Sequence, residues 1–175
     1  MKPLILFSRD TSGKSPSEHP PKQYAPGTRL AYDPALPGRL QQQHRDILDA
    51  LQDVIDAVDG KKYRQAHSLL LDFRSHYQGH LYEKKQRFIP YLNHCLAGEG
   101  KHSEVTLRIS TVSRHLEHRI MDVVRRFEQD GISDASRADC IRELQHMQKD
   151  LVRHMREKEE FIYPMYQPPE AYQAN

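Results

Sequence analysis

The sequence predicts an all-α protein, an up-down-up-down four-helix bundle that follows a proline-rich N-terminal arm. Apolar residues recur at helical spacing in four long segments after residue 39, and glycine-containing breaks separate these segments. No segment shows the alternation that is typical of a half-buried strand. Short connections between long helices favour antiparallel neighbours, which is the up-down arrangement.

Three parts are expected along the chain: an arm over residues 1–38, the bundle over residues 39–167 and a tail over residues 168–175. Most of the eleven prolines lie in the arm, so a helix is not expected there. Its apolar start, Leu4 to Phe7, and the residues Tyr24, Leu30 and Tyr32 are expected either to pack against the bundle or to be mobile.

Each predicted helix carries one apolar stripe. The first runs from Leu40 to Gly60, the second ends near Gly98, the third is closed by Asp130 and Gly131, and the fourth begins near Ser133. The stripes consist of Leu40, Ile47, Leu48, Leu51, Ile55 and Val58; Ala66, Leu69, Leu70, Phe73, Tyr77 and Phe88; Val105, Ile109, Val112, Leu116, Ile120, Val123 and Phe127; and Ile141, Leu144, Met147, Leu151, Met155 and Ile162.

Charge and cysteine content limit the function classes. The formal net charge of +2 gives no electrostatic signature for nucleic acid or an anionic membrane, so neither is expected as a partner. Cys95 and Cys140 lie in different predicted helices without a CxxC spacing, which favours reduced thiols and a cytoplasmic protein. The short apolar run near the N-terminus predicts neither a signal peptide nor a membrane span.

The most informative pattern is a match between the two halves of the chain. His118, His154 and Pro164 each follow a residue of the same type, His44, His80 and Pro90, by 74 residues. A duplicated helix pair would bring these four histidines to similar heights around a pseudo-twofold axis. Convergent imidazoles inside a bundle suit iron, zinc, manganese or copper. A single histidine on an apolar stripe is more often a hydrogen-bonded core residue than a metal ligand. Only the match between the two halves favours these four histidines as metal ligands.

These residues resemble the hemerythrin-like, or HHE cation-binding, domains over about residues 32–166. The similarity lies in His44 within Gln-Gln-His-Arg, His118 within Glu-His-Arg, and His80 and His154, each ten residues before a proline. The resemblance implies a four-helix bundle. It also implies a pair of iron ions held by histidines and two bridging carboxylates, and roles in binding dioxygen or in sensing oxygen, nitric oxide or redox state.

The sequence departs from this family pattern at both bridging positions. The residue four positions after His80 or His154 is Lys84 or Lys158, where the family has glutamate. An ammonium group adds positive charge and cannot ligate a metal while protonated. The nearest carboxylates are Glu83 and Glu157, one residue earlier, and Glu159, one residue later; Glu83 is retained as a candidate ligand in a mononuclear site with His44 and His80.

Helical phase at about 100° per residue places His44, His80, Lys84 and Lys158 close to the centres of their stripes, whereas His118 lies almost opposite its stripe. Both lysines are therefore expected to need a carboxylate partner or a route to solvent.

Two functions follow from these observations. The favoured one is a bundle with a degraded di-iron site that is not an enzyme and acts as a regulatory module binding a protein partner. The alternative is a metal-binding sensor of oxygen, nitric oxide or redox state, with a di-iron or mononuclear site. An enzyme is least supported, since no nucleophile is paired with a base at a recognisable spacing. The sequence also permits a homodimer.

Overall fold

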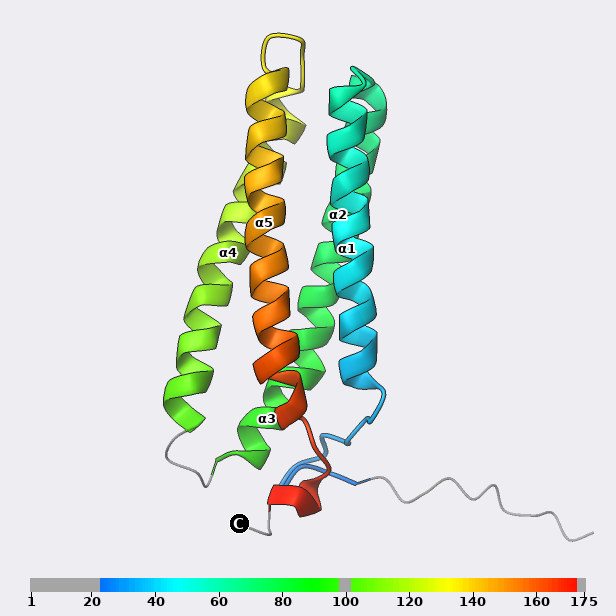
Figure 1. Ribbon diagram of the computed structural model, residues 1–175. Helices are drawn as coiled ribbons and strands as arrows, with labels where there is room; N and C mark the ends of the chain where they lie inside the picture. Colours follow the sequence, from blue (N-terminus) through cyan, green and yellow to red (C-terminus); the bar gives the residue numbers. More distant parts are fainter. Residues whose placement is uncertain (1–22, 98–101, 173–175) are drawn as a thin grey trace, which may run out of the picture.

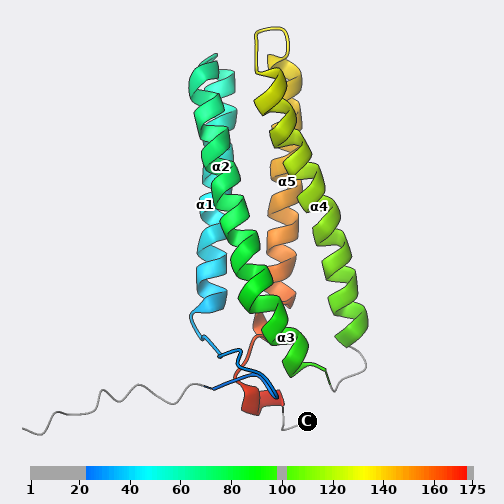
Figure 2. The same cartoon turned by 180° about the vertical axis from the view of Figure 1, so that it is seen from behind.

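The computed structural model describes residues 23–97 and 102–172, with the side chains of residues 102–112 left undescribed. Long helices run side by side in alternating directions, as an up-down-up-down four-helix bundle does (Figures 1 and 2). The helices are α1 (Leu36–Asp59), α2 (Tyr63–Glu83), α3 (Ile89–Cys95), α4 (His102–Asp130) and α5 (Arg137–Phe161). The predicted fold class is confirmed.

The first helix begins earlier than the sequence predicted. It starts at Leu36, within the stretch assigned to the arm, and Pro37 occupies its first turn. A proline fits there because the first amide groups of a helix have no intrahelical partner and the ring holds φ near the helical value. The helix ends at Gly60, as predicted, and Gly131 closes α4 with a positive φ of 71°.

The two matched prolines have different effects on the backbone. Before Pro90 the chain forms a π-helical turn, η1 (Lys84–Phe88), and then continues as α3. A wider turn accommodates the missing proline amide without ending the helical path. In contrast, α5 ends at Phe161, three residues before Pro164, which lies in a short 3-10 helix, η2 (Tyr163–Met165). The second predicted helix is therefore one path made of three segments.

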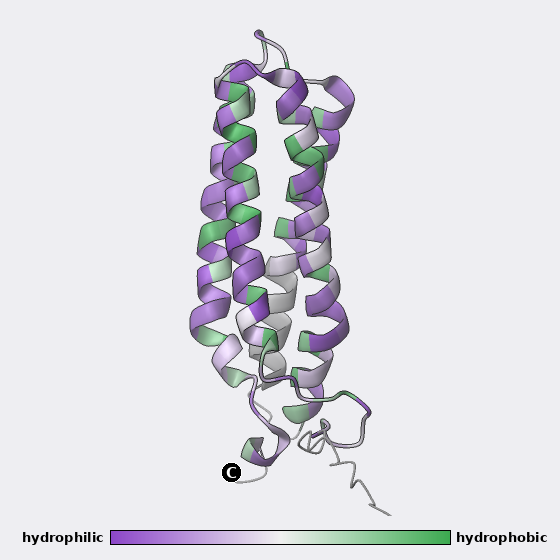
Figure 3. Ribbon diagram, turned by 90° about the vertical axis from the view of Figure 1, so that its right-hand side faces the viewer, coloured by the Kyte–Doolittle hydropathy of each residue, from purple (hydrophilic) through white to green (hydrophobic). Residues whose placement is uncertain are grey.

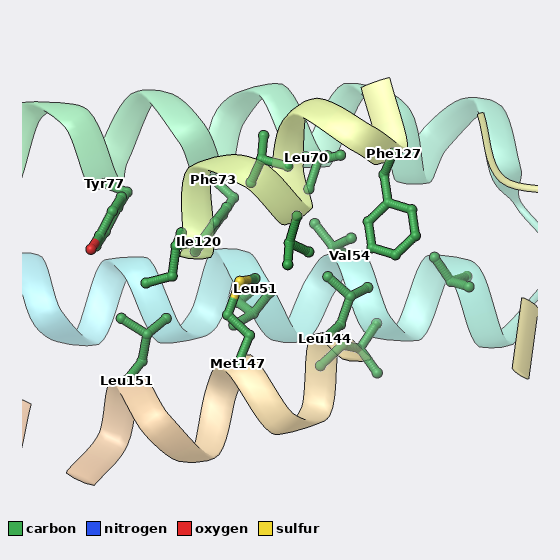
Figure 4. Packing of buried hydrophobic residues seen from close by; sticks show 14 of the residues in the cluster. Leu51, Val54, Leu70, Phe73, Tyr77, Ile120, Phe127, Leu144, Met147 and Leu151 are labelled. Carbon is green, nitrogen blue, oxygen red and sulfur yellow. The ribbon is translucent and has the colours of Figure 1, made fainter. Parts of the chain in front are cut away.

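Two clusters of apolar side chains fill the bundle. The long cluster occupies the part that contains the α1–α2 turn, and Figure 4 shows residues of four helices meeting in it, among them Leu51, Phe73, Ile120 and Leu144. The aromatic cluster lies at the opposite end, around Phe88, Tyr91, Tyr163 and Tyr166. Each described stripe residue lies in one of these clusters or packs against it.

The part of the arm that the structure describes packs on the aromatic cluster. Ala25 is buried, and Leu30 and Tyr32 are partly buried against the cluster, while Tyr24 is exposed. A turn with Gly27 at a φ of 68° brings Tyr24 opposite Ala31 in an antiparallel bridge. Packing is thus confirmed for Leu30 and Tyr32, whereas the apolar start of the arm lies outside the described residues.

The helices differ in how closely they pack. Figures 1 and 2 both show α4 diverging from α5 toward the N-terminal end of α4, which is the end beside α3. Figure 3 shows hydrophilic residues along much of the helices, with shorter hydrophobic stretches between them. Within the described ranges, no helix has the length and apolar character needed to cross a membrane.

Candidate functional site: a charged layer inside the bundle

A layer of polar side chains separates the two apolar clusters. Along α1, His44 lies between Leu40 of the aromatic cluster and Ile47 of the long cluster. The layer, called here the polar layer, consists of the buried polar residues His44, His80, Lys84, Ser113, His154 and Lys158. Burying so many ionisable groups is costly unless they are paired or hydrogen-bonded, so their partners decide what the layer does.

Hydrogen bonds fix the histidines in defined orientations. His44 contacts Glu159 through Nδ1 at 2.6 Å, and its Nε2 lies 3.1 Å from the Tyr163 hydroxyl. The carboxylate can only accept, so the pattern assigns the proton to Nδ1 and makes Tyr163 the donor to Nε2. Both ring nitrogens of His44 are therefore engaged by the protein.

The other two histidines are held by neutral side chains. Nδ1 of His80 lies 3.1 Å from Oε1 of Gln43, and Gln43 in turn donates its amide hydrogen to Glu83 at 2.7 Å. The Ser113 hydroxyl lies 2.9 Å from Nε2 of His154. The rings of His44 and His80 stand 4.8 Å apart between centroids.

The environment keeps all three histidines neutral. Burial lowers the pKa of His44 to about 4, despite the opposing hydrogen bond to Glu159. Burial and the neighbouring charges of His44 and Lys84 lower the pKa of His80 to about 2. For His154, burial followed by the charges of Lys158 and Lys84 lowers the pKa to about 3. The three histidines therefore contribute no positive charge to the layer at neutral pH.

Glu117 on α4 supplies the carboxylate for one of these lysines. Lys84 donates to Oε1 of Glu117 at 3.1 Å, and the exposed Lys85 donates to Oε2 at 2.7 Å. Burial would raise the pKa of Glu117, but its hydrogen bonds and ion pairs with Lys85 and Lys84 hold that pKa below the ordinary value. Glu117 is thus an ionised bridge between a buried and an exposed ammonium group.

Lys158 is buried like Lys84 but is less well compensated. Its side chain is buried, and no carboxylate among the described side chains forms an ion pair with it. Burial and then the adjacent Lys84 ammonium lower the pKa of Lys158 well below its usual range. The two lysines at mirrored positions therefore meet inside the bundle, and only Lys84 has a close carboxylate.

The structure brings His44, His80 and His154 together but leaves His118 outside. His118 is exposed on α4. The reason is that the two pairs of helices match with different offsets. The buried residues of α5 follow those of α2 by 74 positions, as His154 follows His80. The buried residues of α4 follow those of α1 by 73 positions, as Ile120 follows Ile47. The buried α4 position that corresponds to His44 is therefore Glu117. The expectation of four convergent imidazoles is wrong for His118.

The candidate ligand Glu83 also lies beside the layer, not within it. Its carboxylate accepts hydrogen bonds from Arg39 at 3.1 Å, Gln43 at 2.7 Å and Arg87 at 3.4 Å. Burial opposes ionisation, yet these donors hold the pKa of Glu83 below its ordinary value. Glu83 acts on the layer only through Gln43, which orients His80. Glu157 is exposed, so of the three carboxylates considered from the sequence, Glu159 alone contacts a layer histidine.

Several members of the site were missed from the sequence. Glu117 and Ser113 precede the buried Ile120 by three and seven residues, and so the helical phase of α4 could have identified them. Tyr163 and Gln43 gave no comparable signal. Tyr163 belongs to the 3-10 turn after α5, and Gln43 reaches the layer through a long side chain on the flank of α1.

The fold and the layer together define the protein class, a four-helix bundle with a histidine-rich interior of the kind that holds cations. The family model of the hemerythrin HHE cation-binding domain matches residues 37–166. The chain belongs to this family, as its resemblance had indicated. Comparison with curated proteins and with solved structures gave no match.

The described side chains of the polar layer do not meet the requirements of a cation site. Among the residues that the structure describes, no three His, Cys, Asp or Glu side chains are grouped closely enough to hold a metal ion. The space enclosed by the layer is about 10 Å³, no more than the minimum that one water molecule needs. Lys84 and Lys158 line that space together with the three histidines. The described residues do not fit a dication in this arrangement.

Proposed function

We propose that this chain is a metal-independent member of the hemerythrin family that acts as a non-enzymatic, regulatory binding module. The observation that carries the proposal is the position of the two buried lysines. Lys84 and Lys158 lie together at the centre of the bundle, where Lys84 pairs with the carboxylate of Glu117. In this proposal the two lysines take the place of the metal ions, the Lys84 ammonium neutralises Glu117, and the di-iron site is degraded.

The absence of catalysis in this proposal rests on how the layer is occupied. His44 has both nitrogens engaged, and Gln43 and Ser113 contact the other two histidines. A general base must reach a substrate proton directly or through one water, and the small space between the histidines holds no substrate. A protein partner or a second copy of the chain would bind elsewhere, and Tyr82 and Phe161, 68% and 66% exposed, are candidate contacts.

Charge reversal tests the proposed role of the lysines. Lys84→Glu combined with Lys158→Glu restores acidic side chains at both bridging positions and should create affinity for Mn²⁺, Fe²⁺ or Zn²⁺. The matched control is Lys62→Glu with Lys149→Glu, which makes the same charge change at exposed positions. We expect metal to raise the melting temperature of the first variant only. A folded Lys84/Lys158 variant that binds no metal would count against the proposal.

A metal-binding sensor is the second candidate function. It is favoured by the family match and by His80, whose contact with Gln43 places the proton on Nδ1 and leaves Nε2 as the basic nitrogen. Metal occupancy in this case requires both lysines to move aside or lose their protons. Stoichiometric metal in the native protein, with an absorption spectrum that responds to oxygen or nitric oxide, would support this candidate over the first.

A further inference from the structure

We propose that the cavity between α3, α4 and α5 is a binding site for an aliphatic carboxylate, whose head group pairs with Lys158 and whose chain lies along the apolar wall. This inference rests on the proposed function, because it requires Lys84 and Lys158 to be free of metal. It assigns to the binding module a small-molecule ligand of defined chemistry.

The cavity has the size and lining of a ligand site. Its volume is about 560 Å³, within the range of roughly 300–1,000 Å³ that is usual for small-molecule pockets. Its described walls are mostly apolar. They come from η1, α3, α4 and the end of α5, and include Phe88, Ile89, Leu92, Leu96, Met121 and Ile162. The divergence of α4 from α5 accounts for the space (Figures 1 and 2).

The polar side chains that line the cavity are of two kinds: those that it shares with the polar layer, and four others, Lys85, Asn93, Arg114 and His118. Lys84, Ser113, Glu117 and Lys158 line the cavity and also line the small space among the histidines. The large cavity therefore borders the polar layer, and most of its other lining residues are apolar side chains of the two clusters. A largely apolar lining with charged side chains beside it suits an amphiphile, not a uniformly polar metabolite.

The charges favour a monoanion. Lys84 and Lys85 already share the carboxylate of Glu117, so each of them has an ion-pair partner. Lys158 is more than nine-tenths buried and has no ion pair with any described carboxylate. One carboxylate at Lys158 would supply a charge partner for this buried amine.

Decanoate is a suitable probe, and decanol and decyltrimethylammonium are its neutral and cationic counterparts. Titration calorimetry on the native full chain, below the micellar concentration, should give saturable binding of decanoate. Decanol should bind at least about tenfold more weakly, since a hydrogen bond to a charged group is lost, and the cation should not bind. Equal affinity for all three ligands would overturn the assignment of the head group.

Two variants locate the ligand. Lys158→Met should weaken decanoate binding at least about tenfold and leave decanol unchanged, whereas the exposed-site control Lys149→Met should change neither. Ile89→Trp should reduce the affinity for both ligands by filling the cavity, with circular dichroism used to confirm the fold. Decanoate binding that survives Lys158→Met and Ile89→Trp in folded protein would place the ligand elsewhere and overturn the proposal.

Metal analysis of the same sample separates this inference from the proposed function. Metal-free protein that does not bind decanoate would refute the carboxylate site and leave the metal-independent module standing. Stoichiometric metal bound at the layer would refute the proposed function, and the carboxylate site with it, because the ammonium of Lys158 would no longer be available.

Discussion

Replacing each buried lysine by methionine should have opposite effects on stability. Methionine has a similar length, and so the substitution removes the charge with little change in packing. Lys158 has no carboxylate partner among the described side chains and faces the like charge of Lys84. Replacing even a buried ion pair by well-packed apolar side chains is often neutral or stabilising by about 1–4 kcal/mol, and a buried lysine without a partner has no ion-pair energy to offset its desolvation. We therefore expect Lys158→Met to raise the free energy of unfolding by an amount in this range.

Lys84→Met should destabilise the protein. The substitution removes the 3.1 Å contact with Glu117 and leaves that half-buried carboxylate with Lys85 alone. Because one partner remains, the loss is expected to be about 1–3 kcal/mol, below the roughly 3–5 kcal/mol for a fully orphaned buried charge. Lys85→Met, at an exposed position, serves as the control and should change stability by less than about 1 kcal/mol.

Urea unfolding followed by circular dichroism measures both effects.

The pH dependence provides a further check. The pKa of Lys158 is lowered in the folded state from an ordinary value of 10.5. Lys158 therefore destabilises the folded state least above pH 10.5, and this destabilisation grows as the pH falls below that value. The gain in the free energy of unfolding from Lys158→Met should therefore become smaller as the pH rises from 7 toward 10.5. Destabilisation by Lys158→Met, or the same sign for both lysines, would refute the reasoning.

Three further predictions concern the histidines. The pKa values of His44, His80 and His154 are lowered to about 4, 2 and 3. The stability that the neutral rings contribute is therefore full above pH 6.5, and the free energy of unfolding falls below that pH by up to about 4 kcal/mol per pH unit for the three together. Urea midpoints that stay constant from pH 7 to pH 5 would contradict this. Tyr163→Phe should cost about 1–3 kcal/mol, because Nε2 of His44 loses its donor in a buried site; an unchanged unfolding curve would show that the hydroxyl is dispensable. His118→Ala should change stability by less than about 0.5 kcal/mol, whereas His154→Ala should cost more than about 1 kcal/mol; similar losses for the two variants would indicate that both rings are buried.

The sequence was sufficient for the fold and for most of the polar layer. Apolar periodicity identified every helix of the bundle, because each helix must bury one stripe. The same phase argument placed His44, His80, Lys84 and Lys158 at stripe centres, and all four are buried. These positions were predictable because the relation between helical phase and burial is local to one helix.

The remaining features depend on contacts between helices. The match of residue types paired His118 with His44, whereas helical phase had placed His118 almost opposite its stripe, and the structure agrees with the phase: His118 is exposed, and the half-buried Glu117, one residue away, faces the layer. A shift of one residue rotates a side chain by about 100°, enough to move it from the interior to the surface. The contacts of Tyr163 and Gln43 arise only when α1, α2 and the turn after α5 meet, and no pattern within a single helix encodes them.

Elemental analysis of the native full chain, purified without chelator from cells grown with added iron, manganese and zinc, tests the central claim most directly. If Lys84 and Lys158 take the place of metal ions in the polar layer, the protein will be folded, will contain no stoichiometric metal and will show the same melting temperature with and without EDTA. A stoichiometric metal, lost to EDTA together with stability, would contradict the account.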